Sequence, residues 1–243
     1  MSPKYYIGTS GWVYPHWRRV FYPSTLAQSK WLQFYATTFA TVELNNSFYH
    51  LTTEKAFARW YDTSPEGFIF AVKVSRYITH VKRLKEVTEP VSTFLSRAAN
   101  LKEKLGPLLY QLPPNMHRND ERLDSFLRQL PPQHRHVIEF RHKSWLDEPV
   151  FGILRRHNAG LCVFDMPDLT CPPVATSNFA YIRFHGATSL YSSNYSDQEL
   201  DGWAKRIASL GRDLHSAYIY FNNDAEGFAL RNALTLREKL SQG

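Results

Sequence analysis

The sequence predicts an α/β protein that folds as one (β/α)₈ TIM-like barrel over residues 1–243. Three observations predict this class. Short β-rich runs recur along the whole chain, segments with helical spacing lie between most of them, and about 240 residues hold eight such units. Alternation of this kind is typical of βαβ units with a parallel sheet, and eight units fit a barrel better than an open doubly wound sheet.

The strand candidates are short runs rich in β-branched and aromatic residues, bounded by polar, Gly or Pro residues. They cover residues 4–8, 41–45, 68–75, 108–112, 137–141, 161–165, 181–185 and 218–222.

The helix candidates lie between these strands and carry apolar residues at spacings of three and four. They cover residues 26–38, 53–61, 90–105, 120–130, 148–157, 197–210 and 225–240. Asn223 or Asp224 is the expected N-cap of the last helix. The stretch 166–178 contains Pro167, Pro172 and Pro173, so the sixth crossover is expected to be irregular rather than helical.

Composition excludes several classes of protein. The chain has 29 Lys and Arg against 22 Asp and Glu, a net charge of +7, and 43% hydrophobic residues, which is typical of a globular domain and not of a disordered or fibrous chain. No apolar run approaches the roughly 20 residues that span a bilayer, and residues 1–6 lack the apolar stretch of a secretory signal. Cys162 and Cys171 are too few for a disulfide framework. We therefore expect a cytoplasmic protein without a membrane partner.

Polar residues in the predicted strands recur at every second position. Glu43, for example, lies between Val42 and Leu44. Because successive strand side chains point to opposite faces, each polar set shares one face. Helices cover the outside of a barrel, so we expect the polar set to face the axis, near the carboxyl ends of the strands. This set comprises Glu43, Asn45, Lys73, Ser75, Gln111, Glu139, Arg141, Asp165, Arg183, His185 and Asn222.

Ordered blocks of residues along the chain match a known family. They include Gly8-Thr9-Ser10-Gly11-Trp12, Val42-Glu43-Leu44-Asn45, Gln111-Leu112-Pro113-Pro114, Glu139-Phe140-Arg141-His142 and Tyr220-Phe221-Asn222-Asn223-Asp224. With these blocks the sequence resembles the YecE-like family, domain of unknown function 72, from end to end. The resemblance implies a single TIM-like barrel, similar in shape to barrels that include apurinic endonucleases and sugar isomerases, and it implies no particular reaction.

A metal site is one way to use the inward polar residues, since Glu43, His80, Glu139, Asp165 and His185 are residue types that ligate zinc or manganese. The cations on the same face would repel a dication, and no helix carries an H-x-x-x-H pair. The metal-binding sets of similarly shaped barrels have no matching motif here either. We therefore predict no metal and no cofactor.

The inward cations favour an anionic ligand. We expect an enzyme that binds a small phosphorylated or otherwise anionic ring-bearing ligand, such as a nucleotide or a nucleic-acid end, and performs acid-base or hydrolytic chemistry on it. The catalytic candidates are Glu43, Lys73, Glu139 and His185. The ligand-binding candidates are Ser10, Trp12, Tyr14, Asn45, Tyr49, His80, Gln111, Arg141, Asp165, Arg183, Asn222 and Asn223.

Other interpretations stay open at this point. The basic charge and the aromatic loops also suit a non-catalytic nucleic-acid-binding module. Glu43 and Glu139 would suit a metal-independent glycosidase, although nearby cations should keep both ionised. Lys73 would suit an aldolase-type Schiff base, although nearby carboxylates should raise its pKa. The charges would alternatively form a buried ionic network with a structural role only.

Overall fold

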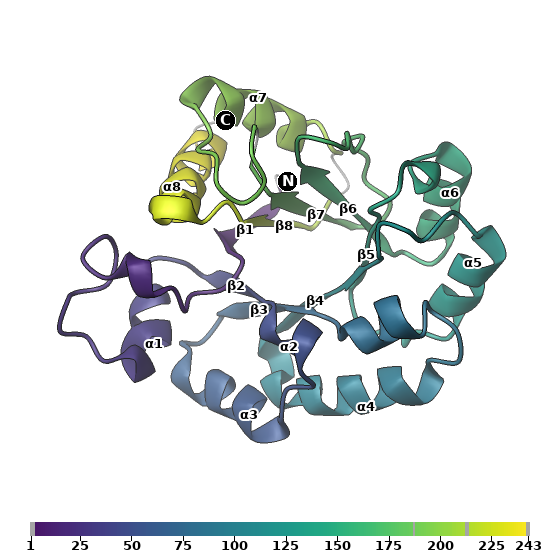
Figure 1. Cartoon of the computed structure of the whole chain (residues 1–243), viewed down its shortest axis with the longest axis horizontal. Coiled ribbons are helices and arrows are strands. Elements are labelled where there is room, and N and C mark those ends of the chain that lie inside the picture. Colours follow the sequence, from purple (N-terminus) through teal and green to yellow (C-terminus); the bar gives the residue numbers. More distant parts are fainter. Residues whose placement is uncertain (1–2, 187, 212–213, 242–243) are drawn as a thin grey trace.

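The computed structural model describes residues 3–186, 188–211 and 214–241. Its centre is an eight-stranded parallel sheet that curls into a barrel, with helices around the outside (Figure 1). This confirms the predicted (β/α)₈ TIM-like fold. The strands are β1 (Lys4–Thr9), β2 (Thr41–Leu44), β3 (Ile69–Lys73), β4 (Leu105–Gln111), β5 (His136–Glu139), β6 (Gly160–Asp165), β7 (Phe179–Phe184) and β8 (Ser216–Phe221).

All eight predicted strands are present, with ends shifted by a few residues. The helices that surround them are α1 (Trp31–Tyr35), α2 (Asn46–Tyr49), α3 (Glu54–Thr63), α4 (Thr88–Ala98), α5 (Asp120–Arg128), α6 (Glu148–Arg156), α7 (Asp197–Ala208) and α8 (Phe228–Ser241). Shorter turns of 3₁₀-helix, and one of π-helix at Tyr77–Val81, extend several of the connections. The stretch 166–178 holds no helix, as its prolines predict.

Local sequence signals explain where several helices begin. The Thr53 hydroxyl accepts a hydrogen bond from the Ala56 amide at the start of α3, and Asn119 does the same for Arg122 at the start of α5. Ser196 and Glu199 form a reciprocal capping box at the start of α7.

The last helix departs from this pattern. The Asp224 carboxylate accepts from the Trp17 indole N–H, and the Asn223 amide donates to Asn232 and to the Ser193 carbonyl. Asp224 occupies the predicted N-cap position, at the start of the 3₁₀ turn Ala225–Gly227 that leads into α8, but its side chain makes no capping hydrogen bond, because tertiary partners occupy it.

Two hydrophobic layers hold the barrel together. The larger layer lies between the strands and the helices, and the smaller one fills the inside of the barrel with residues such as Leu109, Cys162 and Tyr181. Large side chains such as Tyr181 and Tyr218 therefore fill the barrel interior below the carboxyl ends of the strands. Among the described residues no helix is both long and apolar enough to cross a membrane.

The strand order runs β1-β8-β7-β6-β5-β4-β3-β2, so β1 and β2 are the two ends of the sheet. A buried tyrosine joins them. The Tyr35 hydroxyl accepts from the Thr9 amide of β1 and donates to the Thr41 carbonyl of β2, each at 3.0 Å. Gly8 allows this close approach, because a Cβ at that position would lie 2.3 Å from the Thr41 carbonyl oxygen.

We expect Gly8→Ala to lower the free energy of unfolding by about 1–3 kcal/mol, since the atom that the new methyl group meets belongs to the backbone and cannot rotate away. Urea denaturation checks this. Gly152→Ala is the matched control, because Gly152 lies in α6 with open space around it, and that change should leave stability equal or slightly higher. Equal stability of Gly8→Ala and the wild type would contradict the role of this glycine in the close approach of β1 and β2.

Candidate functional site

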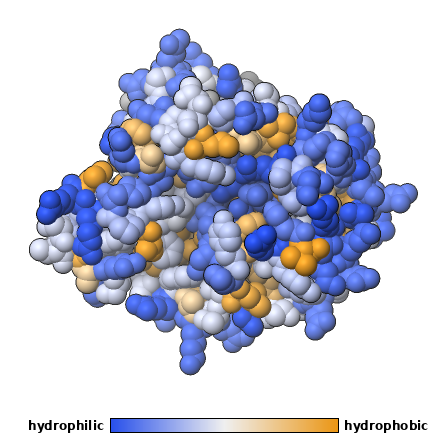
Figure 2. All heavy atoms as spheres, viewed as in Figure 1, coloured by the Kyte–Doolittle hydropathy of each residue, from blue (hydrophilic) through white to orange (hydrophobic). Residues whose placement is uncertain are grey.

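A cavity of about 460 Å³ opens at the carboxyl ends of the strands. Seen from the side on which α2 lies, hydrophilic residues gather over the middle of the molecule (Figure 2). Eight of the predicted site residues line the cavity: Ser10, Tyr14, Asn45, Tyr49, Lys73, Gln111, Arg183 and Asn222. The strand parity that the sequence shows thus places most of the polar set around one axis.

Arg183 lies at the centre of this arrangement and is only 1% exposed. Its two terminal nitrogens each donate to a buried carboxylate, Nη2 to Glu43 Oε2 and Nη1 to Glu139 Oε2, both at 2.8 Å. The guanidinium therefore joins β2, β5 and β7 inside the barrel. These two ion pairs offset the cost of burying one guanidinium and two carboxylates.

Glu43 is held by neutral groups as well. The hydroxyls of Ser10 and Tyr181 each donate to it at 2.7 Å, and the Asn45 amide donates at 3.0 Å. Burial acts to raise the pKa of Glu43, but the attraction of Arg183 and these hydrogen bonds outweigh it, so the pKa is lowered. Glu43 is therefore an ionised anchor rather than a proton donor.

Glu139 is in a similar position. Arg141 donates to its second oxygen, and together with Arg183 it lowers the pKa of Glu139 well below the ordinary value, against the effect of burial. The expectation that nearby cations keep both glutamates ionised agrees with this geometry. A pair of ionised carboxylates gives no general acid, which removes the main requirement of the glycosidase interpretation.

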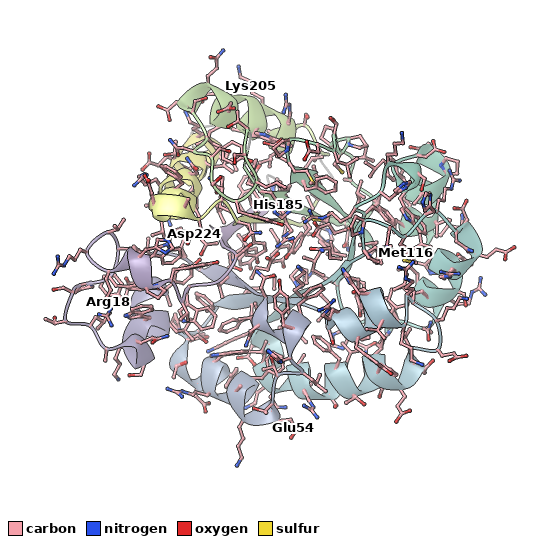
Figure 3. All side chains as sticks on the ribbon, in the orientation of Figure 1. Arg18, Glu54, Met116, His185, Lys205 and Asp224 are labelled. Atoms are coloured by element: carbon pink, nitrogen blue, oxygen red, sulfur yellow. The ribbon has the colours of Figure 1, made fainter. Side chains whose placement is uncertain are left out.

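His185 lies behind this pair, fully buried near the barrel axis (Figure 3). Its Nε2 lies 3.0 Å from Arg141 Nη2, and because a guanidinium only donates, Nε2 acts as the acceptor. Its Nδ1 lies 3.2 Å from the Asn222 side-chain amide. Burial and the charge of Arg183 lower the pKa of His185 to about 4, so the ring is neutral at pH 7.

Lys73 ends β3 and is 7% exposed. Its ammonium nitrogen lies 4.0 Å from the centre of the Phe48 ring and faces the cavity. Burial, and next the charge of Arg183, lower its pKa to about 8, although Glu139 and Glu43 act in the opposite direction. The carboxylates thus act in the expected direction, but burial and the neighbouring arginines outweigh them and the net pKa is lowered.

Asp224 also lines the cavity, at the start of the segment that leads into α8 (Figure 3). Burial raises its pKa to about 6. Its Oδ1 accepts from the Trp17 indole at 2.8 Å, and its Oδ2 lies 3.0 Å from His16 Nε2. The same His16 nitrogen lies 2.8 Å from the Asp224 backbone oxygen, which accepts a hydrogen bond from it.

Sequence reasoning missed Asp224, together with His16 and Tyr191, as part of this lining. Asp224 could have been predicted, because it lies two residues after Asn222 and so falls on the same inward-facing alternation as β8. It was not selected because the sequence also suggested a helix N-cap at this position.

Four predicted residues lie elsewhere. Asp165 points outward toward Tyr195 and Trp203, because β6 is apolar on both faces and its inward residues are Cys162 and Phe164. Trp12 is buried against Trp60, and Asn223 bonds to Asn232. His80 packs on the Phe48 ring and is not among the described residues that line the cavity. The inward placement of Asp165 and a position in this cavity for Trp12 and Asn223 were wrong predictions.

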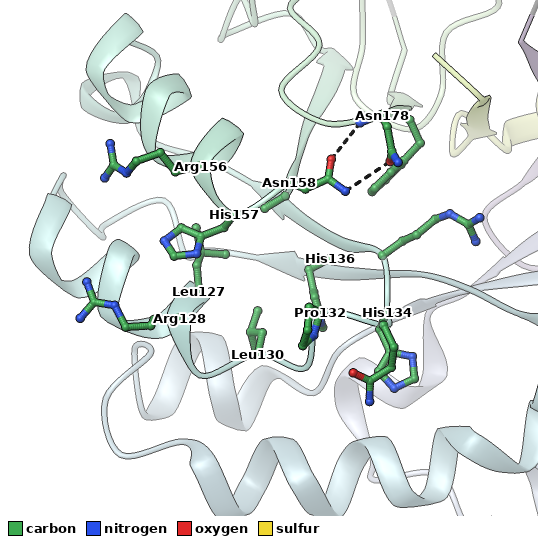
Figure 4. A pocket seen from close by; sticks show the side chains of 14 residues that line it. Leu127, Arg128, Leu130, Pro132, His134, His136, Arg156, His157, Asn158 and Asn178 are labelled. Atoms are coloured by element: carbon green, nitrogen blue, oxygen red, sulfur yellow. Dashed lines mark hydrogen bonds between the residues drawn. The ribbon is translucent and has the colours of Figure 1, made fainter. Parts of the chain in front are cut away.

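A second hollow of about 610 Å³ lies at the opposite end of the barrel (Figure 4). Arg128, Arg156 and His157, at the carboxyl ends of α5 and α6, all approach Asp124. Positive side chains stabilise helix carboxyl ends, so this arrangement has a structural explanation. Among the described residues, no three His, Cys, Asp or Glu residues come together as metal ligands.

Comparisons with known proteins agree with the fold. The chain is 27% identical over 275 residues to the UPF0759 protein YunF of Bacillus subtilis (strain 168), covering 97% of this chain and 94% of that protein. It is 31% identical over 141 residues to the UPF0759 protein YecE of Escherichia coli (strain K12), covering 58% of this chain and 49% of that protein.

A solved structure is similar over nearly its whole length. The crystal structure of a DUF72 family protein from Thermotoga maritima MSB8 matches with a TM-score of 0.87 and 30% identity, covering 98% of this chain and 99% of that one. The family model described as "Protein of unknown function DUF72" matches residues 6–243. The chain therefore belongs to the DUF72 family.

Proposed function

We propose that the carboxyl-end cavity binds a small anionic ligand that carries a ring and hydroxyl groups, and that the protein is an enzyme with acid-base chemistry at this site. One observation carries the proposal. The two glutamates are already paired with arginines, whereas the Lys73 ammonium faces the cavity and, in the part of the chain that the structure describes, has no carboxylate within 4.0 Å. An anion is the partner that this positive charge lacks.

Unsatisfied polar atoms support a polar ligand. Among the described residues, two buried side-chain atoms of the cavity lining have no hydrogen-bond partner, Asn45 Oδ1 and Arg183 Nε. Buried polar groups normally find partners. A ligand hydroxyl group would donate to Asn45, and an anionic oxygen would accept from Arg183.

Two tyrosines at the mouth of the cavity favour a ring. Tyr49 is 63% exposed and Tyr191 is 48% exposed, which is unusual for large aromatic side chains on a compact surface. Stacking on a sugar or base ring would use these faces. The ligand class is therefore a phosphorylated sugar, a nucleotide or a similar ring-bearing anion.

The residues then divide into two kinds. Glu43, Glu139 and Arg141 hold Arg183 in place and act as positioning residues. Asp224, with a pKa of about 6, can both take up and release a proton near neutral pH and is the acid-base group.

Calorimetric titration with inorganic phosphate, ribose 5-phosphate and neutral ribose tests the binding step. We expect ribose 5-phosphate to bind best, and Lys73→Met to weaken its binding by about 10- to 100-fold, the usual value of a charged hydrogen bond (about 1.5–3 kcal/mol). Lys82→Met is the matched control, since Lys82 is partly exposed and pairs with Glu86. Its effect should stay below about threefold.

Equal binding of ribose and ribose 5-phosphate would contradict the proposal. A single-stranded oligonucleotide separates it from a nucleic-acid-binding module. Tight binding that falls steeply with added salt and is unaffected by Lys73→Met would favour such a module instead.

A further inference from the structure

Two lysines are buried in the described part of the chain, and they differ in one respect. Lys104 is 5% exposed, and its ammonium donates to the carbonyls of Tyr61 and Ser64 and to the Ser64 hydroxyl at 2.7–3.0 Å. Lys73 is 7% exposed, and its ammonium has the Phe48 ring on one side and the cavity on the other. No hydrogen-bond acceptor of the described residues satisfies it. Lys104 is thus a structural lysine, and Lys73 is held ready for another partner.

We propose that Lys73 forms an imine with the ligand, so that the substrate of this cavity is an aldehyde or ketone that carries an anionic group. This inference rests on the proposed function, because it uses the same cavity and the same preference for an anion. It adds the reacting group of the substrate and the nucleophile of the protein.

The charge around Lys73 supplies what this step needs. A lysine must lose its proton to act as a nucleophile. Burial and the nearby Arg183 lower the pKa of Lys73 to about 8, so roughly one amine in ten is neutral at pH 7. The same positive field attracts the anionic part of the substrate, which in turn offsets the positive charge of the iminium that forms.

The step balances as follows. The neutral amine adds to the carbonyl carbon, a C–N bond forms, and the carbonyl π electrons move to oxygen. The nitrogen loses one proton and the oxygen gains one, which gives a carbinolamine. The C–O bond then breaks, the oxygen leaves as water with one further proton, and the nitrogen lone pair forms the C=N⁺ bond. Asp224 lines the same cavity and is the acid that supplies this proton.

Reductive trapping tests the inference on the whole protein. The protein is incubated with glyoxylate, ribose 5-phosphate or neutral acetaldehyde in the presence of sodium cyanoborohydride, which reduces the iminium to a stable amine by hydride transfer. Peptide mass spectrometry then locates the adduct. We expect glyoxylate or ribose 5-phosphate to be trapped at Lys73 at least tenfold faster than at any other lysine. The rate should be greatest between pH 6 and pH 8, because the step needs a neutral Lys73 and a protonated Asp224.

Two variants that keep the positive charge test whether a lost adduct reflects a lost fold. Lys73→Arg keeps the positive charge and should abolish the adduct while leaving the melting temperature within a few degrees of the wild type. Lys82→Arg should change neither. Because the pH profile of labelling is measured on the wild type, the inference stays testable if Lys73→Arg does not fold.

The outcomes separate the two proposals. Equal labelling of Lys73 and Lys82 overturns the imine. Calorimetric binding of ribose 5-phosphate without any adduct at Lys73 also overturns the imine and leaves the proposed anion binding intact. Preferential labelling of Lys73 by acetaldehyde as fast as by glyoxylate supports the nucleophile and overturns the preference for an anion.

Discussion

Arg183→Met is expected to lower the free energy of unfolding by about 3–5 kcal/mol, the largest effect of any single substitution proposed for this protein. The variant leaves Glu43 and Glu139, both fully buried, without the guanidinium that joins them. Chemical denaturation followed by circular dichroism at pH 7 measures the change. Arg155→Met is the matched control, because Arg155 pairs with Glu148 at the surface, and its effect should be within about 0.5 kcal/mol.

Two further measurements assign the loss to uncompensated charge. Adding Glu43→Gln and Glu139→Gln to Arg183→Met should recover part of the stability, since neutral amides are less costly to bury. The folded-state pKa values of both glutamates are lowered, so their stabilising effect is complete above about pH 4.5 and is lost as the pH falls through the folded values. The difference between wild type and Arg183→Met should therefore shrink in acid. We call the pairing of Arg183 with Glu43 and Glu139 the clamp. A loss of unfolding free energy below about 1 kcal/mol at pH 7 would disprove its stabilising role.

Asp224→Asn is expected to lower kcat/KM by about 100- to 10,000-fold, the usual contribution of general acid catalysis. The assay uses the substrate that the wild type turns over in a panel of ribose 5-phosphate, p-nitrophenyl phosphate and bis-p-nitrophenyl phosphate. A general acid acts while protonated, and the pKa of Asp224 is about 6, so wild-type kcat/KM should fall as the pH rises through 6. Glu226→Gln, at an exposed carboxylate two residues away, is the control and should leave turnover unchanged.

Stability distinguishes this role from a structural one. The folded pKa of Asp224 is raised above its unfolded value of 3.8, so its ionisation destabilises the fold as the pH rises from 3.8 through 6. Asp224→Asn should therefore be as stable as the wild type at pH 5 and equal or more stable at pH 8. The Trp17 indole can still donate to the amide oxygen. A variant that loses stability at pH 8, with turnover intact, would make Asp224 structural.

Much of the fold is readable from the sequence because strand and helix periodicities differ. Every strand was predicted, and Pro167, Pro172 and Pro173 correctly indicated the irregular sixth crossover. The short helix α2 and the π-helical turn at Tyr77–Val81 were missed, since segments of four or five residues are too short to show a period.

The site was predictable as a set of residues but not as a pattern of pairs. Strand parity correctly placed Lys73 and Arg183 in one cavity, with Glu43 buried beside Arg183. It failed for Asp165, because both faces of β6 are apolar and neither parity stands out. The pairing itself joins residues 140 positions apart, and only the folded barrel decides that the carboxylates neutralise Arg183 instead of Lys73.

The clamp across β2, β5 and β7 also has a consequence for synthesis on the ribosome. The chain emerges from its N-terminus, so both glutamates leave the exit tunnel long before Arg183 does. A nascent chain that ends after β6 holds six of the eight strands and would have to desolvate Glu43 without Arg183, so we expect its interior to stay open and hydrated. The interior can become dry only once β7 has supplied Arg183, and β8 then pairs with β1 to complete the sheet.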